Sequence, residues 1–401
     1  MEKMKALFLE NIHPYAGEIL RGSGVDITSF SKSLSEAELI AQMKGVQFLG
    51  IRSRTQITHN LLENSPNLLA IGAYCIGTNQ IDLDSTSLAG VAAFNAPYSN
   101  TRSVAEIVIA EIIFLIRKLY DKITNAHKGI WDKSADNTHE VRGKTLGILG
   151  YGNIGSQVST LAESMGMKVY YYDIVDKLTI GNATRLSSMD ELLKISDIIT
   201  VHVDGSTVNK NLIGTDEFSK MKDGVIFLNL SRGFVVNIDA LKSNIANGKI
   251  SGAAVDVFPE EPRSPEDKFF SPLQNLPNVL LTPHIGGSTE EAQYNIAEFV
   301  SNKLIEYFKT GSTYTSVNFP RIQLSPLSGS SRLLHIHKNL PGVLSQINTI
   351  FARNSVNVES QFLQTNEKIG YVVTDVDKNY NNSLLDDLKK VDNTIKVRIL
   401  S

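Results

Sequence analysis

Three groups of polar residues follow apolar, strand-like runs in the second half of this 401-residue chain. Arg232 follows "FLNLS", the acids Asp256, Glu260 and Glu261 lie in "VDVFPEEP", and His284 follows "LLTP". Histidine suits acid–base work because its ordinary pKa, roughly 6.5, lies near neutral pH, and arginine can bind a carboxylate through two hydrogen bonds. Singly, each residue could be a surface side chain or a helix cap. Together they supply the base, orienting carboxylate and cation that oxidation of a 2-hydroxy acid requires.

A glycine-rich turn precedes these groups. In "TLGILGYGNIGSQ", Gly150, Gly152 and Gly155 form G-x-G-x-x-G between an apolar strand and a helix, the context in which this motif binds a dinucleotide. Asp173 ends the next strand, "KVYYYD", near the offset of about 20 residues expected for an acid that binds the adenosine ribose. Its carboxylate would repel a 2′-phosphate, so NAD is favoured over NADP, although Lys177 lies close by.

Alternating strand and helix patterns must position these residues. One alternation runs from Lys5 to about Asn95, a long apolar helix is expected over 102–120, and a second alternation of six apolar runs begins at Thr145. Such alternation predicts parallel sheets flanked by helices. We expect two Rossmann-like doubly wound domains, one of them discontinuous: residues 1–99 with 287–329, and residues 100–286.

The C-terminal residues 330–401 form a third expected domain, after a Pro/Ser/Gly-rich linker at 322–331. Its pattern is ferredoxin-like βαββαβ, with Pro341 in the first turn of a helix and His335 and His337 on one face of the first strand. No third metal ligand with suitable spacing lies near these histidines, so no metal is expected. Before the linker, Ser288 and Glu291 have the spacing of a capping box. The expected elements are strand 332–338, helix 341–354, strands 356–365 and 369–377, helix 382–392 and strand 394–400.

Composition restricts the class of protein. The chain is 42% hydrophobic and 20% charged, with a formal net charge of −3, so neither nucleic acid nor membrane is expected as a partner. The single cysteine, Cys75, excludes an internal disulfide and reads as a packed side chain. The N-terminus lacks the apolar run of a signal peptide. We therefore expect a soluble, cytoplasmic protein.

The sequence resembles the D-isomer-specific 2-hydroxyacid dehydrogenases, and in particular the short members that end in a regulatory ACT domain. The resemblance covers nearly the whole chain and is carried by "GIRSRTQIT", "LGILGYGNIGSQ", "NLSRGFVV", "AAVDVFPEEP", "LLTPHIGGSTEEAQ", "SVNFP" and "HIHKNLPGVL". It implies NAD-dependent oxidation of 3-phospho-D-glycerate to 3-phosphohydroxypyruvate, the first step of serine biosynthesis, with feedback inhibition by L-serine. It also implies a homotetramer, and reduction of 2-oxoglutarate as a second activity.

The resemblance also implies roles for individual residues. Arg232 binds and polarises the substrate, Glu261 orients His284, and His284 is the acid/base; Glu260 receives no role. The residues implied to contact NAD are Gly150, Gly152, Asn153, Ile154, Gly155, Asp173, Leu230, Ser231, Arg232, Asp256, His284, Ile285, Gly286 and Gly287. Those implied for the substrate are Lys32, Arg52, Ser53, Arg54, Asn100 and Lys133, of which the arginine pair suits a phosphate or carboxylate. Those implied for L-serine are His337, Asn339 and Asn357.

Two alternatives stay open. A different D-2-hydroxyacid dehydrogenase, acting on glyoxylate or hydroxypyruvate, is disfavoured by the paired arginines and the C-terminal domain. A non-catalytic, NAD-sensing corepressor or scaffold on the same fold would bind the cofactor without turnover. The complete Arg232, Glu261 and His284 set disfavours it.

Overall fold

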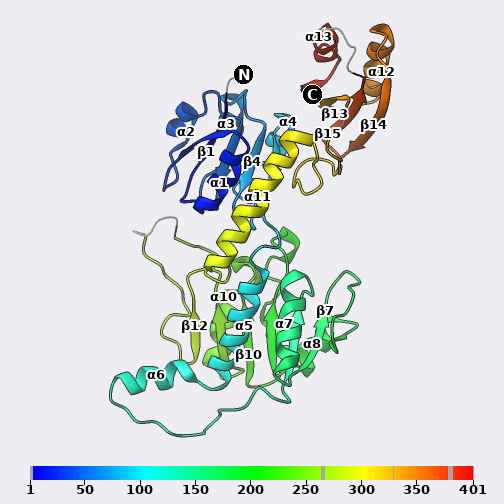
Figure 1. Cartoon of the computed structure of the whole chain (residues 1–401). Coiled ribbons are helices and arrows are strands. Elements are labelled where there is room, and N and C mark those ends of the chain that lie inside the picture. Colours follow the sequence, from blue (N-terminus) through cyan, green and yellow to red (C-terminus); the bar gives the residue numbers. More distant parts are fainter. Residues whose placement is uncertain (1–2, 263–266, 328, 378–382, 401) are drawn as a thin grey trace. The chain divides into compact units, whose positions relative to one another are not determined.

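A computed structural model of the chain describes residues 3–262, 267–327, 329–377 and 383–400. The chain divides into two compact units. Residues 1–99 with 293–401 make the discontinuous unit, and residues 100–292 make the central unit (Figure 1). Among the described helices, none combines the length and apolar character needed to cross a bilayer.

The first sheet of the discontinuous unit is parallel, with strand order β2-β1-β3-β4-β5. Every residue of β3, β4 and β5 is buried, as expected for strands covered on both faces. Its elements are β1 (Met4–Phe8), α1 (Pro14–Gly22), β2 (Val25–Ser29), α2 (Glu36–Gln42), β3 (Phe48–Ile51), α3 (His59–Glu63), β4 (Ala70–Ala73), α4 (Leu83–Leu88) and β5 (Ala92–Phe94).

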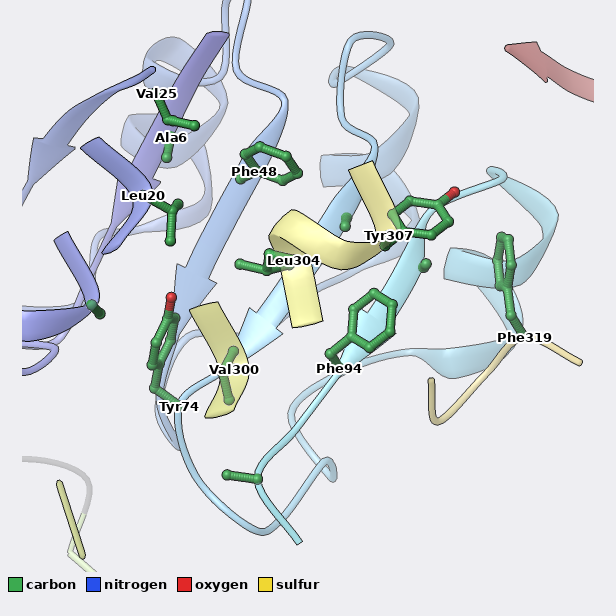
Figure 2. Packing of buried hydrophobic residues seen from close by; sticks show 14 of the residues in the cluster. Ala6, Leu20, Val25, Phe48, Tyr74, Phe94, Val300, Leu304, Tyr307 and Phe319 are labelled. Atoms are coloured by element: carbon green, nitrogen blue, oxygen red, sulfur yellow. The ribbon is translucent and has the colours of Figure 1, made fainter. Parts of the chain in front are cut away.

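Helix α11 (Glu290–Thr310) packs on this sheet, although some 190 residues separate it from β5 in the sequence. Figure 2 shows Val300, Leu304 and Tyr307 of α11 among Phe48 and Phe94 of the strands. The expected capping box of Ser288 and Glu291 is wrong. The hydroxyl of Thr289 instead accepts the Ala292 N–H at 3.1 Å, because the helix begins one residue later than that pattern requires.

The central unit has a seven-stranded parallel sheet of order β12-β11-β10-β9-β6-β7-β8. Within this sheet the first strand is the central β6, and the following strands run outward to the edge at β8. The chain then returns to β9, which pairs with the other side of β6. The reversal between β6 and β9 is the switch point where doubly wound folds bind ligands. Its elements are β6 (Thr145–Leu149), α7 (Asn153–Ser164), β7 (Lys168–Tyr172), β8 (Thr184–Arg185), α8 (Met189–Ile195), β9 (Ile198–Val201), α9 (Thr215–Lys220), β10 (Val225–Asn229), α10 (Ile238–Ala246), β11 (Ile250–Val255) and β12 (Val279–Leu281).

The single helix expected over 102–120 is two helices. Helix α5 spans Thr101–Ile116 and α6 spans Leu119–His127. Lys118 between them has a φ of 50°, a left-handed conformation that breaks the helical backbone. The sequence shows no glycine or proline there to signal the break.

The C-terminal part forms an antiparallel sheet of order β14-β15-β13-β16, which matches the expected βαββαβ pattern. Its first helix starts later than expected, because Gly342 has a φ of 91° and Pro341 therefore lies before the helix. His335 and His337 do share a face of β13, with ring centroids 5.6 Å apart. The elements are β13 (Ser331–Lys338), α12 (Val343–Arg353), β14 (Val358–Thr365), β15 (Ile369–Val376), α13 (Ser383–Lys389) and β16 (Thr394–Leu400).

Candidate active site

The glycine-rich turn joins β6 to α7 in the central unit. Gly150 has a φ of 93°, and a Cβ there would lie 2.6 Å from the His202 carbonyl oxygen. A Cβ at Gly155 would lie 2.3 Å from the Gly150 oxygen, so only glycine allows α7 to approach the turn. A Cβ at Gly152 would meet nothing within 4 Å. The space in front of Gly152 is thus not filled by the protein, and α7 has no side-chain cap on its first N–H groups, which is the arrangement a pyrophosphate requires.

Asp173 follows β7 and faces this turn. One carboxylate oxygen accepts the Tyr151 N–H at 2.8 Å, and the other accepts the Val175 N–H at 2.9 Å. The carboxylate is therefore held beside the turn with lone pairs left for ribose hydroxyls. Arg185, which the sequence pattern did not single out, donates to the Asp173 carbonyl at 3.3 Å and forms an ion pair with Asp176 at 2.8 Å.

Arg232 lies in a turn that Asn229, the last residue of β10, holds in place. The Asn229 side-chain oxygen accepts the Ser231 N–H at 3.1 Å, and its amide donates to the Arg232 carbonyl at 3.1 Å. Gly233 packs directly on Phe258, where a Cβ would lie 2.0 Å from a backbone carbon. Sequence reasoning missed Asn229, although its place at a strand end was a usable signal.

Asp256 organises the loop that carries His284. The residue is 2% exposed, and its carboxylate accepts three hydrogen bonds: from the Thr282 hydroxyl at 2.6 Å, the Ile285 N–H at 2.8 Å and the Gly286 N–H at 2.8 Å. His284, between these anchors, has a φ of 54°, a conformation that residues other than glycine rarely adopt. The hydrogen bonds of the Asp256 carboxylate thus hold the loop in an unfavourable backbone conformation, as is common at functional sites.

His284 and Glu261 form a hydrogen-bonded pair. The His284 Nδ1 lies 2.8 Å from one Glu261 oxygen, and the other accepts the Phe258 N–H at 3.1 Å. The hydrogen bond to Glu261 raises the pKa of His284 above its ordinary value, against the opposing effect of burial. Burial raises the pKa of Glu261, but the hydrogen bond and charge of His284 outweigh it, and the Glu261 pKa lies below its ordinary value. The His284 side chain is half-exposed (51%), so its ring can exchange a proton with a bound molecule.

The pKa of His284 predicts a pH dependence. Oxidation of a hydroxyl group needs neutral His284, so its rate should rise with pH through a pKa above 6.5, whereas reduction needs protonated His284 and should decline there. Removing the partner charge with Glu261→Gln should lower that pKa and move both profiles toward acid. The kcat/KM–pH profiles in both directions measure this shift. Glu260→Gln, at the adjacent exposed position, is the matched control, and an equal shift in both variants would contradict the pairing.

The other candidate substrate residues fall into two groups. Asn100 lies in the central unit against Gly287, whose Cβ would meet the Asn100 amide at 2.0 Å, while Lys133 is exposed beyond α6. Lys32, Arg52, Ser53 and Arg54 lie in the discontinuous unit. There Ser53, Arg54 and Lys32 are exposed and Arg52 is half-buried.

The three candidate effector residues lie at two ends of the C-terminal sheet. His337 pairs with Gly370 on β15, and the Asn339 N–H bonds to the Lys368 oxygen. The Asn357 carbonyl instead accepts the N–H of Asp377, which lies just beyond β15 and seven residues after Gly370. At about 3.4 Å per residue, these seven residues span about 24 Å, so Asn357 lies more than about 20 Å from the other two within one chain. His337 is 3% exposed, and its buried Nδ1 has no hydrogen-bond partner within the described ranges.

Comparison with known proteins gives two family matches. Residues 109–286 match the D-isomer specific 2-hydroxyacid dehydrogenase, NAD binding domain, and residues 333–396 match an AHAS small subunit-like ACT domain. The chain is 48% identical to D-3-phosphoglycerate dehydrogenase of Haemophilus influenzae, covering 99% of this chain and 97% of the relative. It is also 48% identical to that of Escherichia coli K12, covering 100% and 98%. The chain belongs to the D-3-phosphoglycerate dehydrogenases, within the D-isomer-specific 2-hydroxyacid dehydrogenase family.

Structural comparison agrees with this family. D-2-hydroxyisocaproate dehydrogenase aligns with a TM-score of 0.72 at 25% identity, over 79% of this chain and all of that one. As a D-2-hydroxyacid dehydrogenase, the chain is an NAD-dependent oxidoreductase with two Rossmann-like sheets and a C-terminal ACT domain. The expected fold class and cofactor are therefore confirmed.

Proposed function

We propose that this enzyme oxidises 3-phospho-D-glycerate to 3-phosphohydroxypyruvate, the first step of L-serine biosynthesis. The observation that carries the proposal is the His284–Glu261 pair at 2.8 Å, in a chain 48% identical over its length to D-3-phosphoglycerate dehydrogenases. The relatives support a phosphorylated hydroxy acid as the substrate, and the pair supplies the acid–base group that the reaction needs.

The site residues of the central unit then have distinct roles in this reaction. NAD, when bound, supplies the hydride acceptor; Gly152, the α7 N-terminus and Asp173 would hold it. His284 takes the proton of the C2 hydroxyl, and Glu261 stabilises the resulting imidazolium. Arg232 binds the carboxylate beside C2, and its charge polarises the carbonyl that forms. Asp256 keeps the His284 loop in place throughout.

A substrate panel tests the proposed function. Purified enzyme should interconvert NAD and NADH with 3-phosphoglycerate or 3-phosphohydroxypyruvate at a kcat/KM at least tenfold above that for glyoxylate or hydroxypyruvate. Absence of turnover with the phosphorylated pair would overturn the proposal. Preference for an unphosphorylated substrate would indicate another dehydrogenase, and NADH binding without any turnover would indicate a sensor or scaffold. The panel includes 2-oxoglutarate, whose reduction we propose as a second activity.

We further propose that L-serine inhibits the enzyme by binding between the ACT domains of two chains in a homotetramer. Within one chain Asn357 lies more than about 20 Å from His337 and Asn339, too far for one amino acid to contact all three. A two-fold axis beside the outer strand β14 would bring Asn357 of one copy toward Asn339 of the other. The distances thus support an effector site shared between copies.

Loss of the effector residues should abolish inhibition. We expect L-serine to inhibit the wild type and the His337→Ala, Asn357→Ala double variant to need at least 100-fold more serine. Hybrids that pair an Asn339→Ala chain with an Asn357→Ala chain should keep one intact site of two and regain partial inhibition. The measurement is a serine titration of activity, with D-serine as the control ligand. Retained inhibition in the double variant would refute the site.

A further inference from the structure

Three neighbouring strands of the discontinuous unit end at one edge of its sheet. Strand β1 lies between β2 and β3, and all three are parallel. Lys32 follows β2, Glu10 follows β1 and Arg52 follows β3. The carboxyl edge of a parallel sheet is where such folds bind ligands, so an acid here lies amid the candidate cations.

Glu10 is bonded to the backbone that bears these cations. One carboxylate oxygen accepts the Arg52 N–H at 3.2 Å and the Thr55 N–H at 2.8 Å, and the other accepts the Arg54 N–H at 3.0 Å. The Glu10 N–H in turn donates to the Lys32 carbonyl at 3.4 Å. With 8% of its surface exposed, Glu10 joins the segments that carry all three cations.

The backbone at Glu10 is held in an unfavourable conformation. Glu10 and Asn11 have φ values of 65° and 53°, left-handed conformations that cost on the order of 1 kcal/mol each. Gln80, 6% exposed, holds the same loop from the other side by donating to the Arg52 carbonyl at 2.6 Å. The Arg52–Thr55 loop is therefore fixed through its backbone on both sides.

Because the loop is held through its backbone, the cationic side chains remain available to bind a ligand. Lys32 and Arg54 are exposed and Arg52 is half-buried, and none of the three forms an ion pair with a carboxylate in the part of the chain that the structure describes. Glu10 bonds to their backbone amides rather than to their charged groups. Three cations held at a strand edge in this way suit a doubly charged anion.

We propose that Glu10 is a positioning residue, which holds Lys32, Arg52 and Arg54 as one site for the phosphate end of the substrate. The inference rests on the proposed function, since it takes the phosphorylated hydroxy acid as the ligand. Glu10 positions the three cationic residues through hydrogen bonds to their backbone groups. Glu10 thereby determines how strongly the enzyme prefers phosphorylated substrates.

The test compares phosphohydroxypyruvate with hydroxypyruvate in the full-length enzyme. Glu10→Gln should raise the KM for phosphohydroxypyruvate about tenfold, because an amide group then faces a backbone N–H. The kcat should change less than threefold, and the KM for hydroxypyruvate and the affinity for NADH should change less than twofold. Glu10→Asp keeps the charge and should restore part of the KM. If the glutamine variant does not fold, the KM values of Glu10→Asp test the proposal instead.

Asn318→Ala is the matched control. Asn318 is likewise buried in this unit and bonds to the backbone of Val91 and Ala93, away from the cationic loop. This variant should lower the Tm without changing either KM. If Glu10→Gln behaves like it, or raises both KM values equally, the proposal fails.

A readout without turnover separates this inference from the proposed function. Inorganic phosphate should raise the Tm of the wild type and raise that of Glu10→Gln much less. If the wild type does not turn over phosphohydroxypyruvate but shows this difference, the proposed function fails and the role of Glu10 stands. Normal turnover with equal phosphate effects in both proteins would overturn the role of Glu10 alone.

Discussion

Replacing His284 with asparagine should lower kcat by 10²- to 10⁴-fold, the usual contribution of a general acid–base group. Asparagine can keep a hydrogen bond to Glu261 but cannot take up the hydroxyl proton. Because the Asp256 carboxylate holds the loop through the backbone of Ile285 and Gly286, the loop should survive the substitution. NADH affinity should therefore change little. Steady-state kinetics and NADH fluorescence titration measure the two quantities.

His59→Asn is the matched control for this substitution. His59 also pairs with a carboxylate, Glu63, at 3.1 Å, but on the exposed surface of α3. It should leave kcat unchanged. If His284→Asn kept more than about a tenth of the wild-type kcat, His284 would not be the acid–base group.

Replacing Glu111 with glutamine should stabilise the central unit strongly at neutral pH. Glu111 lies in α5, is 5% exposed, and neither carboxyl oxygen has a hydrogen-bond partner among the residues that the structure describes. Burial, together with the nearby Asp256 charge, raises the pKa of Glu111 to about 8. The folded chain thus keeps a proton that the unfolded chain releases near its ordinary pKa of 4.5.

The sign and size of this effect follow from proton linkage. Between pH 4.5 and about 8 the folded state binds more protons, so each pH unit of increase removes about 1.4 kcal/mol of stability. At pH 7 the accumulated loss is about 3 kcal/mol, which glutamine would abolish. The Tm gain should be roughly 6–10 °C at pH 7 and close to zero near pH 4.5.

Calorimetry at several pH values checks this expectation. Glu106→Gln on the same helix is the control, because Glu106 is exposed and pairs with Arg102 at 2.6 Å, an interaction of a few tenths of a kcal/mol. Parallel Tm–pH curves for the wild type and Glu111→Gln would show that Glu111 is not held protonated.

The sheets and the ends of their strands could be predicted from the sequence. Apolar runs such as "FLNL" and "LLTP" are bounded sharply, and a parallel sheet brings their carboxyl ends together, so Arg232 and His284 could be placed at strand ends before the fold was known. The glycine spacing around Gly152 was equally informative, because a Cβ would clash at Gly150 and at Gly155, whereas at Gly152 the missing side chain leaves open space for a ligand.

The supporting residues could not be predicted in the same way. Glu10 bonds to a loop more than 40 residues away, and Gln80 bonds to one 28 residues away, so no local pattern reveals either contact. Glu111 reads in the sequence only as a charge within an apolar helix. Lys118 breaks that helix through a backbone conformation that lysine does not signal.

The discontinuous unit has a consequence for how the chain is made. Strand β5 is held by Ser316 and Asn318, and the sheet is covered by α11, but residues 100–292 are synthesised in between. At about 5–20 residues per second, the ribosome needs roughly 10–40 s to bridge that interval. During this time the apolar surface that will receive Val300 and Leu304 has no partner, and by its end the central unit has its full sequence. The half that carries Arg52 and Arg54 is therefore completed last, after the half that carries His284.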